Sequence, residues 1–285
     1  MPEVWSAEEH VDEERARQLI RAQFREIRTD EVSLVSEGWD YAVFRVDGEW
    51  AFRFPRRGAV VPGTEREIAV LPALAERLPV AVPAPLFVGR ASDDFPWPFY
   101  GARYLEGFEA TGRPVDPVAL GEALRALHAP GSFEAVGRKL PADPLGRVDM
   151  AVRLPRLEEH GVDAPELVAA ARTLPPAAHT AVCHGDLHMR QVLVDGDALT
   201  GIVDWVDVCR SDPAVDLSVA WSTLDAARRR SFFAAYAEVD EETRVRARVV
   251  ASFLCAALAD WARKEQVPPV LDAALAGLQR AVEEA

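Results

Sequence analysis

The sequence predicts an α+β protein in two parts: an antiparallel sheet with one packed helix over residues 1–105, and a mostly helical part over residues 106–285. Short segments of β-type composition lie close together before residue 105, and helical spacing dominates from Pro117 onward. Gly107 and Gly112 mark a linker between the two patterns. A chain of 285 residues is long enough for two modest cores.

In the first part, one helix is predicted before the strands in addition to the packed helix among them. Ser6 precedes an acidic stretch, and apolar side chains follow at helical spacing as far as Phe24. We therefore expect Ser6 to cap the first helix, because serine accepts hydrogen bonds from the free N–H groups of a first turn. A second helix is expected over residues 62–78, where apolar side chains recur at intervals of three and four.

β-Branched and aromatic side chains predict the strands of this part, at residues 32–35, 41–46, 50–54, 86–88 and 99–105. The dipeptide Asp47-Gly48 separates the second strand from the third. An Asp-Gly pair between two such runs is the strongest short signal for a β-hairpin. We therefore expect these two strands to pair antiparallel.

In the second part, Leu120, Leu124 and Leu127 form one apolar stripe of a helix. The one interruption of strand-like composition lies at residues 182–205. Further helices are expected up to the C-terminus, at residues 214–224, 228–237, 241–264 and 268–284.

Composition argues against several classes of partner and location. A net charge of −14 argues against a nucleic-acid partner, because binding to phosphate backbones rests on basic surface. No apolar run is long enough to cross a membrane, and the acidic start does not fit a signal peptide. The three cysteines form no CxxC pair. We expect a cytoplasmic protein with neither nucleic-acid nor membrane partners, and the sequence leaves its oligomeric state open.

The chemistry concentrates between residues 182 and 205. Asp186 and Gln191 lie in a polar turn between two apolar strands, and Asp204 follows the second strand. Phosphoryl transfer needs one carboxylate to take a proton from the attacking hydroxyl, and oxygen ligands to hold Mg²⁺ against the phosphates. This set of side chains therefore predicts phosphoryl transfer.

The pattern resembles the aminoglycoside phosphotransferase family, which includes aminoglycoside and macrolide kinases. The resemblance rests on the His-Gly-Asp sequence at residues 184–186, the Ile-Val-Asp-Trp sequence at 202–205 and the segment 211–217. It implies a bilobal protein-kinase-like fold, with an antiparallel-sheet N-lobe, a mostly helical C-lobe and the nucleotide in the cleft at their junction.

The same resemblance implies roles for single residues. Asp186 would be the catalytic base, and Asp204 would bind Mg²⁺. Asp216 would be a structural carboxylate that braces the catalytic loop, with His184 packed behind it. The family usually has Asn where this chain has Gln191, and this chain contains no Asn at all. Gln keeps the amide oxygen, so we expect Gln191 to be the second Mg²⁺ ligand.

In the first part, the resemblance implies a short loop over the nucleotide, a basic strand residue at the phosphates, a helix carboxylate paired with it and a linker whose backbone meets the nucleobase. The basic residue is usually Lys, but here it is Arg, whose planar guanidinium is larger. The residues expected to hold the nucleotide are Gly38, Trp39, Arg53, Glu67, Arg103 and Leu105.

The predicted activity is that of a kinase which moves the γ-phosphate of ATP or GTP to a hydroxyl of an aminoglycoside or a macrolide. From residue 106 onward the chain has 28 acidic and 19 basic residues, which suits a polycationic aminoglycoside. A macrolide would instead need a broad apolar wall. Two alternatives remain: a kinase for a housekeeping amino alcohol or sugar, and a nucleotide-binding protein with little transferase activity. Arg53 and Gln191, which replace two residues usual in kinases, motivate the second alternative.

Overall fold

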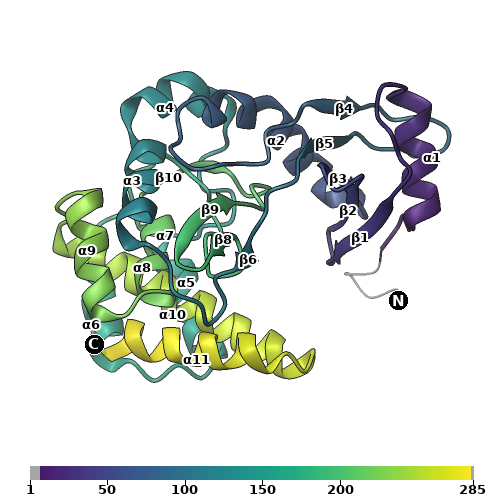
Figure 1. Ribbon diagram of the computed structural model, residues 1–285. Helices are drawn as coiled ribbons and strands as arrows, with labels where there is room; N and C mark the ends of the chain where they lie inside the picture. The colour runs from purple at the N-terminus through teal and green to yellow at the C-terminus, as the bar shows by residue number, and fades with distance from the viewer. Residues whose placement is uncertain (1–6, 284–285) are drawn as a thin grey trace. The chain divides into compact units, whose positions relative to one another are not determined.

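The computed structural model describes residues 7–283, which fold as two compact units. The first unit comprises Met1–Ala75 and Val82–Leu105, and the second comprises Glu76–Ala81 and Glu106–Ala285. An antiparallel sheet forms the centre of the first unit, and most of the helices belong to the second (Figure 1). The predicted fold class is therefore confirmed.

The first unit contains a five-stranded antiparallel sheet in the order β1-β2-β3-β5-β4. Its strands are β1 (Val32–Glu37), β2 (Tyr41–Val46), β3 (Trp50–Pro55), β4 (Phe87–Gly89) and β5 (Phe99–Arg103). Asp47 and Gly48 have φ angles of 47° and 69°, as a type I′ turn requires, and β2 pairs antiparallel with β3. The predicted hairpin is therefore confirmed.

Helix α1 (Glu13–Gln23) begins later than the sequence suggests. The predicted cap, Ser6, lies outside the described residues. The observed N-cap is Asp12, whose side chain accepts a hydrogen bond from the Arg15 N–H at 2.8 Å. Aspartate caps a helix as well as serine does, and the acidic first turn that follows complements the helix dipole.

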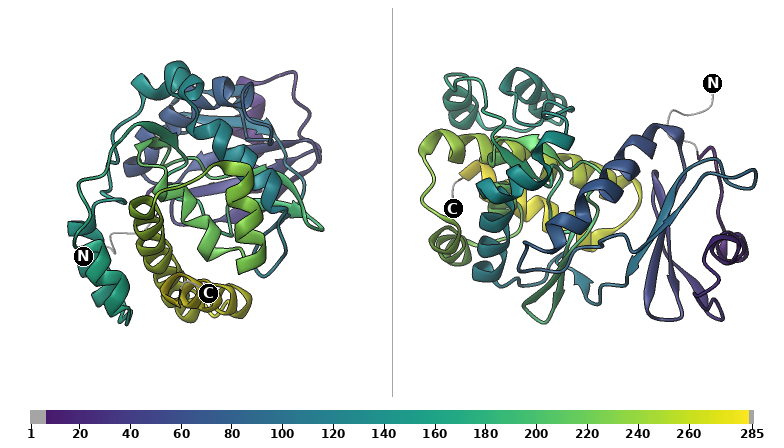
Figure 2. Two further views of the ribbon diagram at one scale, coloured as in Figure 1. Left: turned by 90° about the vertical axis from the view of Figure 1, so that its left-hand side faces the viewer. Right: turned by 90° about the horizontal axis from the view of Figure 1, so that it is seen from above.

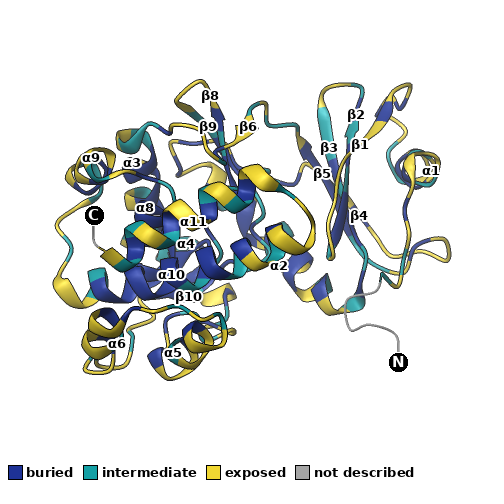
Figure 3. Ribbon diagram, turned by 90° about the horizontal axis from the view of Figure 1, so that it is seen from below, coloured by how far each residue is buried: buried dark blue, intermediate teal, exposed yellow. Residues whose placement is uncertain are grey.

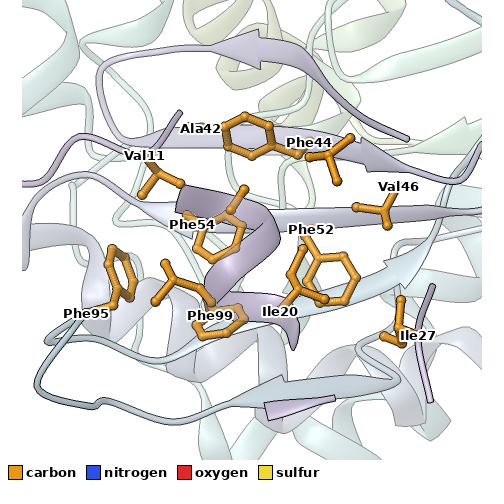
Figure 4. Close-up of a cluster of buried hydrophobic side chains, with 13 residues drawn as sticks. Val11, Ile20, Ile27, Ala42, Phe44, Val46, Phe52, Phe54, Phe95 and Phe99 are labelled. Carbon is orange, nitrogen blue, oxygen red and sulfur yellow. The ribbon is translucent and has the colours of Figure 1, made fainter. Parts of the chain in front are cut away.

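One face of the sheet packs against α1 through aromatic and aliphatic side chains (Figure 4). Phe52 and Phe54 point into this cluster, and Ile20 meets them from the helix. Successive strand residues point to opposite faces. Arg53, which lies between the two phenylalanines, therefore points to the other face of the sheet.

That other face is met by α2 (Val61–Ala75), which follows the short 3-10 helix η1 (Gly58–Val60). The hydroxyl of Tyr41 in β2 lies 3.0 Å from the Thr64 hydroxyl of α2. The helix ends at Ala75, before the predicted end at residue 78. Pro79 disfavours helical backbone at the residue that precedes it, so the last residue of the predicted range is excluded from the helix.

The second unit is mostly helical. Its helices are α3 (Pro117–His128), α4 (Pro130–Val136), η2 (Gly137–Lys139), α5 (Met150–Glu159), α6 (Pro165–Ala171), α7 (Ala214–Leu217), α8 (Val219–Ser222), α9 (Ala226–Tyr236), α10 (Glu241–Lys264) and α11 (Pro268–Glu283). The long helices α10 and α11 pack side by side (Figure 2). Helix α10 carries buried side chains along most of its length (Figure 3). None of the described helices is both long and apolar enough to span a membrane.

Two small sheets lie among these helices. One has the order β6-β8-β9, and the other pairs β10 with β7. Their strands are β6 (Phe108–Glu109), β7 (Ala181–Cys183), β8 (Val192–Asp195), β9 (Ala198–Ile202) and β10 (Cys209–Ser211). The sequence predicts strand structure at residues 182–205 but misses β6 and β10, because two or three residues are too few to show an alternating pattern.

Candidate active site

The predicted catalytic loop, residues 184–191, joins β7 to β8 in the second unit. Gly185 has a φ of 91°, a conformation that costs glycine little and other residues much more. A Cβ atom at this position would lie 2.4 Å from the backbone oxygen of Asp207. The glycine of the His-Gly-Asp sequence is therefore required both by the turn and by the close approach of the backbone.

Asp216 holds the start of this loop. Its fully buried carboxylate accepts the N–H of His184 at 2.7 Å and the N–H of Gly185 at 3.0 Å. Burial alone would raise the pKa of Asp216, but the hydrogen bond and charge of His128, together with these contacts, lower it below its ordinary value. Such a geometry agrees with the bracing role that the family resemblance implies.

His184 is buried behind the loop. Its Nε2 lies 2.9 Å from the backbone oxygen of Val203, and its ring packs 4.7 Å from that of Trp205, measured between centroids. Its Nδ1 accepts the N–H of Asp186 at 3.3 Å. His184 thus connects the loop to the segment after β9, as expected of a packing residue.

A second layer supports Asp216, and sequence reasoning misses it. His128, the last residue of α3, places Nε2 3.1 Å from Asp216 Oδ2 and Nδ1 2.9 Å from the hydroxyl of Tyr236. His128 and Asp216 are separated by 88 positions in the chain, so no local pattern connects them. A histidine in the last turn of a helix is otherwise explained by the helix dipole.

The side chain of Asp186, the predicted base, is partly exposed at 28% and carries an ion pair that the sequence does not reveal. Arg147 donates from Nη1 to Asp186 Oδ1 and from Nη2 to Asp207 Oδ2, the latter at 2.5 Å. One guanidinium therefore bridges two carboxylates. The position of Asp207, three residues after Asp204, is the only hint of this arrangement that the sequence offers.

Opposed effects set the ionisation of this network. Burial alone would lower the pKa of Arg147, but the charges of Asp186 and Asp207 raise it above its ordinary value, so the guanidinium stays charged. Burial raises the pKa of Asp207, and Arg147 opposes that rise. The shared cation offsets the repulsion between the two carboxylates.

His188 lies on the other side of Asp186. Its Nε2 is 3.9 Å from Asp186 Oδ2, which is too far for a hydrogen bond. Burial lowers the pKa of His188 to about 4, so the ring is neutral near pH 7. His188 therefore contributes packing and polarity at the base without adding a charge.

The two predicted metal ligands come from adjacent strand ends. Gln191 accepts the N–H of Val203 through its backbone oxygen at 2.9 Å, and Asp204 is the next residue, with a φ of 64°. Gln191 is 8% exposed, and its side-chain Oε1 has no hydrogen-bond partner among the described residues. A buried amide oxygen without a partner is costly unless something else satisfies it.

In the first unit, Arg53 and Glu67 come together as the sequence predicts. Arg53 Nε lies 3.6 Å from Glu67 Oε2, and the Glu67 side chain is fully buried. The guanidinium carbon of Arg53 also lies 3.7 Å from the ring centroid of Tyr41, a cation–π contact that the sequence does not predict. Arg53 is therefore held on two sides.

Gly38 and Trp39 belong to the turn between β1 and β2. The Gly38 N–H donates to the backbone oxygen of Tyr41 at 2.9 Å, and Arg56 donates to the Gly38 oxygen while pairing with Glu37 at 2.5 Å. Trp39 is 50% exposed. The turn is thus anchored at its base, and the large aromatic side chain that it carries is half-exposed.

Arg103 and Leu105 lie at and just beyond the end of β5. The Arg103 guanidinium pairs with Glu49 and lies 4.3 Å from the centroid of a Trp50 ring. This side chain is therefore engaged within its own sheet and is not directed toward Arg53. The nucleobase contact that the resemblance implies would therefore come from the backbone of Arg103 and Leu105, and not from the Arg103 side chain.

Comparison with known proteins adds a family and a fold. A model of the phosphotransferase enzyme family matches residues 31–250. A homoserine kinase from Methylobacillus flagellatus is 31% identical over 138 residues, which are 43% of this chain and 42% of that relative. The chain thus matches less than half of the length of this curated relative.

Among solved structures, the GDP complex of aminoglycoside 2′-phosphotransferase-IIIa has a TM-score of 0.71 at 21% identity, covering 96% of this chain and 99% of that one. Macrolide 2′-phosphotransferase MphH from Brachybacterium faecium has a TM-score of 0.64 at 21% identity, covering 94% of this chain and 97% of that one. These likenesses show the fold. The family match itself includes the loop at residues 184–191 and its brace Asp216, and on that ground the chain belongs to the phosphotransferase enzyme family.

Proposed function

We propose that this chain is a small-molecule kinase that transfers the γ-phosphate of ATP or GTP to a hydroxyl of an antibiotic-like acceptor, an aminoglycoside or a macrolide. The observation that carries the proposal is the placement of Asp186 directly after a glycine turn whose N–H groups are bonded to Asp216. A carboxylate placed in this way is suited to orient a hydroxyl and accept its proton. In phosphoryl transfer this role accompanies the positioning and charge stabilisation of the phosphates, which supply most of the catalysis.

Two side chains of the second unit fit a magnesium ion. Gln191 offers a buried oxygen with no hydrogen-bond partner in residues 7–283, and Asp204 offers a carboxylate one residue after the Val203 N–H that bonds the Gln191 backbone. Mg²⁺ prefers oxygen ligands of this kind. When bound, the ion neutralises charge on the nucleotide phosphates. We propose Gln191 and Asp204 as the residues that hold it.

The first unit supplies the groups proposed to hold the phosphates. Arg53 is fixed between Glu67 and the ring of Tyr41, so its cation needs little rearrangement to meet a phosphate. The turn at Gly38 is the proposed loop over the nucleotide. The similarly folded aminoglycoside 2′-phosphotransferase binds GDP, which supports a nucleoside triphosphate as the donor.

Two classes of acceptor have support. Similar folds include a kanamycin complex and a macrolide 2′-phosphotransferase, and the acidic composition from residue 106 onward favours a cationic aminoglycoside. The homoserine kinase relative, at 31% identity, supports a second candidate, a kinase of a small amino alcohol or similar metabolite.

The proposal is tested by Mg²⁺-dependent consumption of ATP and GTP with kanamycin, gentamicin, a macrolide, homoserine and choline as acceptors. Asp186→Asn should abolish acceptor-stimulated turnover while nucleotide still binds, because only the base is lost. Asp195→Asn is the matched control: this exposed carboxylate lies at the end of β8, close to the loop, and should keep full turnover.

The outcomes separate the hypotheses. Turnover with an antibiotic, together with a raised inhibitory concentration in a susceptible bacterial host, supports the antibiotic kinase. Turnover with homoserine or choline alone moves the assignment to a metabolite kinase. Nucleotide binding with no turnover on any acceptor contradicts the kinase and favours a nucleotide-binding protein.

A further inference from the structure

The ion-pair network beside Asp186 has no place in the family pattern described above, yet its guanidinium touches the carboxylate that must accept the proton. Arg147 Nη1 bonds Asp186 Oδ1, and Nη2 bonds Asp207 Oδ2 at 2.5 Å. We propose that Arg147 is a positioning residue for the catalytic base, holding Asp186 in one orientation through a fork shared with Asp207. The inference rests on the proposed function of Asp186 as the base.

The segment that carries Arg147 is built to hold it. Asp143 accepts the N–H of Arg147 at 2.8 Å and the N–H of Val148 at 3.1 Å through its two carboxylate oxygens. Arg153 donates to the backbone oxygens of Arg147 and Leu145, both at 3.1 Å. Hydrogen bonds therefore hold the backbone of Arg147 at both its N–H and its C=O.

The backbone that follows is also fixed. Arg246 of α10 donates from Nη1 to the backbone oxygen of Val148 at 2.8 Å. Asp149 then caps α5 by accepting the N–H of Ala151 at 2.9 Å. The backbone of one short turn is therefore hydrogen-bonded to three charged side chains: Asp143 accepts, and Arg153 and Arg246 donate.

The geometry also assigns different roles to the two oxygens of Asp186. Oδ1 is engaged by Arg147, while Oδ2 lies 3.9 Å from His188 Nε2 and accepts no hydrogen bond in the described part of the chain. Oδ2 is therefore the oxygen left to take the proton of an acceptor hydroxyl. A carboxylate free to rotate about its side-chain bond would spend time in orientations that cannot do so.

A planar fork is needed for this task. Arginine presents two N–H groups in a fixed geometry and can bond two carboxylates at once, whereas the ammonium of lysine is a compact point charge. The Arg147 side chain is 15% exposed, and those of Asp186 and Asp207 are 28% and 24% exposed, so solvent only partly replaces the contact when it is lost. The proposal therefore predicts that replacing Arg147 lowers kcat, and that a lysine at this position does not restore kcat in full.

The test compares Arg147→Ala, Arg147→Lys and Arg248→Ala. Arg248 is a matched control, because it is also a buried arginine of the second unit, bonded to the backbone oxygens of Ala281 and Val282 at 2.9 Å each, and it lies outside the proposed site. Turnover is measured with the acceptor of the panel above that gives the fastest nucleotide consumption. If no acceptor gives faster consumption than water does, nucleotide hydrolysis is measured instead. Circular dichroism first sets a guanidinium chloride concentration below the onset of unfolding.

We expect Arg147→Ala to lower kcat about 10- to 100-fold with little change in the KM for nucleotide, because a small misplacement of a reacting group is this costly. Added guanidinium ion should restore part of the lost kcat in Arg147→Ala and leave Arg248→Ala and the wild type unaffected. Arg147→Lys should also lower kcat, and it keeps the test valid where Arg147→Ala does not fold.

Three results would overturn the inference: wild-type kcat in Arg147→Lys, a rise in kcat when Arg147 is removed, or no rescue of a folded Arg147→Ala by guanidinium. A rise in kcat would mean that the ion pair between Arg147 and Asp186 inhibits the base. These failures differ from failure of the proposed function, in which the wild type itself consumes no nucleotide or Asp186→Asn remains active. That result removes the base and, with it, any positioning role for Arg147.

Discussion

The carboxylate of Asp216 accepts the backbone N–H of His184 at 2.7 Å, so a helix residue fixes the first position of the proposed catalytic loop, residues 184–191. The other carboxylate oxygen takes the next N–H, that of Gly185. The loop conformation therefore depends on one buried charge. His128 in turn contacts that charge from α3.

Replacing the charge of Asp216 should destabilise both the loop at residues 184–191 and the second unit that contains it. In Asp216→Asn, an amide has one oxygen and cannot accept both N–H groups, so one buried donor loses its partner. We expect a loss of about 1.5–3 kcal/mol in the free energy of unfolding, the range for hydrogen bonds to charged groups. Urea denaturation followed by circular dichroism measures it, and an unchanged midpoint would show that the brace is dispensable.

The same carboxylate predicts an acid-sensitive part of the stability. The pKa of Asp216 lies below its ordinary value of 3.8, so as the pH falls the unfolded chain binds a proton before the folded one does. The stabilisation is present in full above about pH 4 and is lost as the pH falls further toward the folded pKa. The gap between the wild type and Asp216→Asn should therefore narrow below that pH. A constant gap in unfolding free energy across the acid range would contradict this.

Gly185→Ala tests the close approach in the loop. Both Gly185 and Gly196 have positive φ, 91° and 64°, but only Gly185 would bring a Cβ atom against backbone, 2.4 Å from the oxygen of Asp207. Gly196 has nothing within 4 Å of such an atom. The control Gly196→Ala should cost only the left-handed backbone, about 1–2 kcal/mol.

We expect Gly185→Ala to lose more stability than Gly196→Ala does, because the loop must move away from Asp207. For the same reason, we expect Gly185→Ala to abolish turnover. Thermal unfolding and kcat, measured on both variants, check this. Equal losses in the two variants would mean that the backbone contact at Gly185 is unimportant.

The sequence predicts those features that local patterns determine. The hairpin between β2 and β3 follows from Asp47-Gly48, whose backbone conformation the two residue types favour by themselves. Asp186, Gln191 and Asp204 are recognisable because they occur together in one short segment. Their joint appearance is informative even though each residue alone is common.

Arg147 could not be predicted in this way. It lies in a loop 39 positions before Asp186, and nothing in the intervening sequence connects the two. The contact arises from tertiary structure, as does that between His128 and Asp216, which are separated by 88 positions. The cap of α1 is likewise observed at Asp12, a residue type that satisfies the chemistry of a cap as well as serine does.

Arg53→Lys tests whether the cation of β3 must be an arginine. Lysine keeps the charge but loses the planar contact with Tyr41, so the side chain would have to be ordered when nucleotide binds. A cation–π contact of a partly buried pair is worth about 1–2 kcal/mol, which sets an upper limit near a thirtyfold weakening of nucleotide affinity. Isothermal titration with ATP and GTP measures the change.

The matched control is Arg45→Lys. Arg45 in β2 makes the same kind of contact, with its guanidinium carbon 3.9 Å from the ring centroid of Tyr104, but it is not among the residues proposed to hold phosphate. Nucleotide affinity should be unchanged in this variant. If the two variants weaken binding equally, the effect arises from the sheet in general and not from Arg53.

Gln191→Leu should raise the stability of the metal-free protein and weaken its use of Mg²⁺. The buried Oε1 of Gln191 has no hydrogen-bond partner among residues 7–283, so an apolar side chain of similar size removes an unsatisfied polar atom. Without metal, we expect the variant to be more stable than the wild type by about 1 kcal/mol. With nucleotide, it should need a much higher Mg²⁺ concentration for half-maximal turnover, because one oxygen ligand is gone.

Gln191→Asn serves as the control, because it keeps the amide oxygen on a side chain shorter by one methylene group. Its Mg²⁺ requirement should stay closer to that of the wild type than the requirement of Gln191→Leu does. Melting temperatures in the presence of a chelator, together with Mg²⁺ titrations of kcat, separate the two effects. If Gln191→Leu gains stability and keeps the wild-type Mg²⁺ requirement, the buried oxygen is a tolerated defect, and Asp204 must hold the ion with ligands other than Gln191.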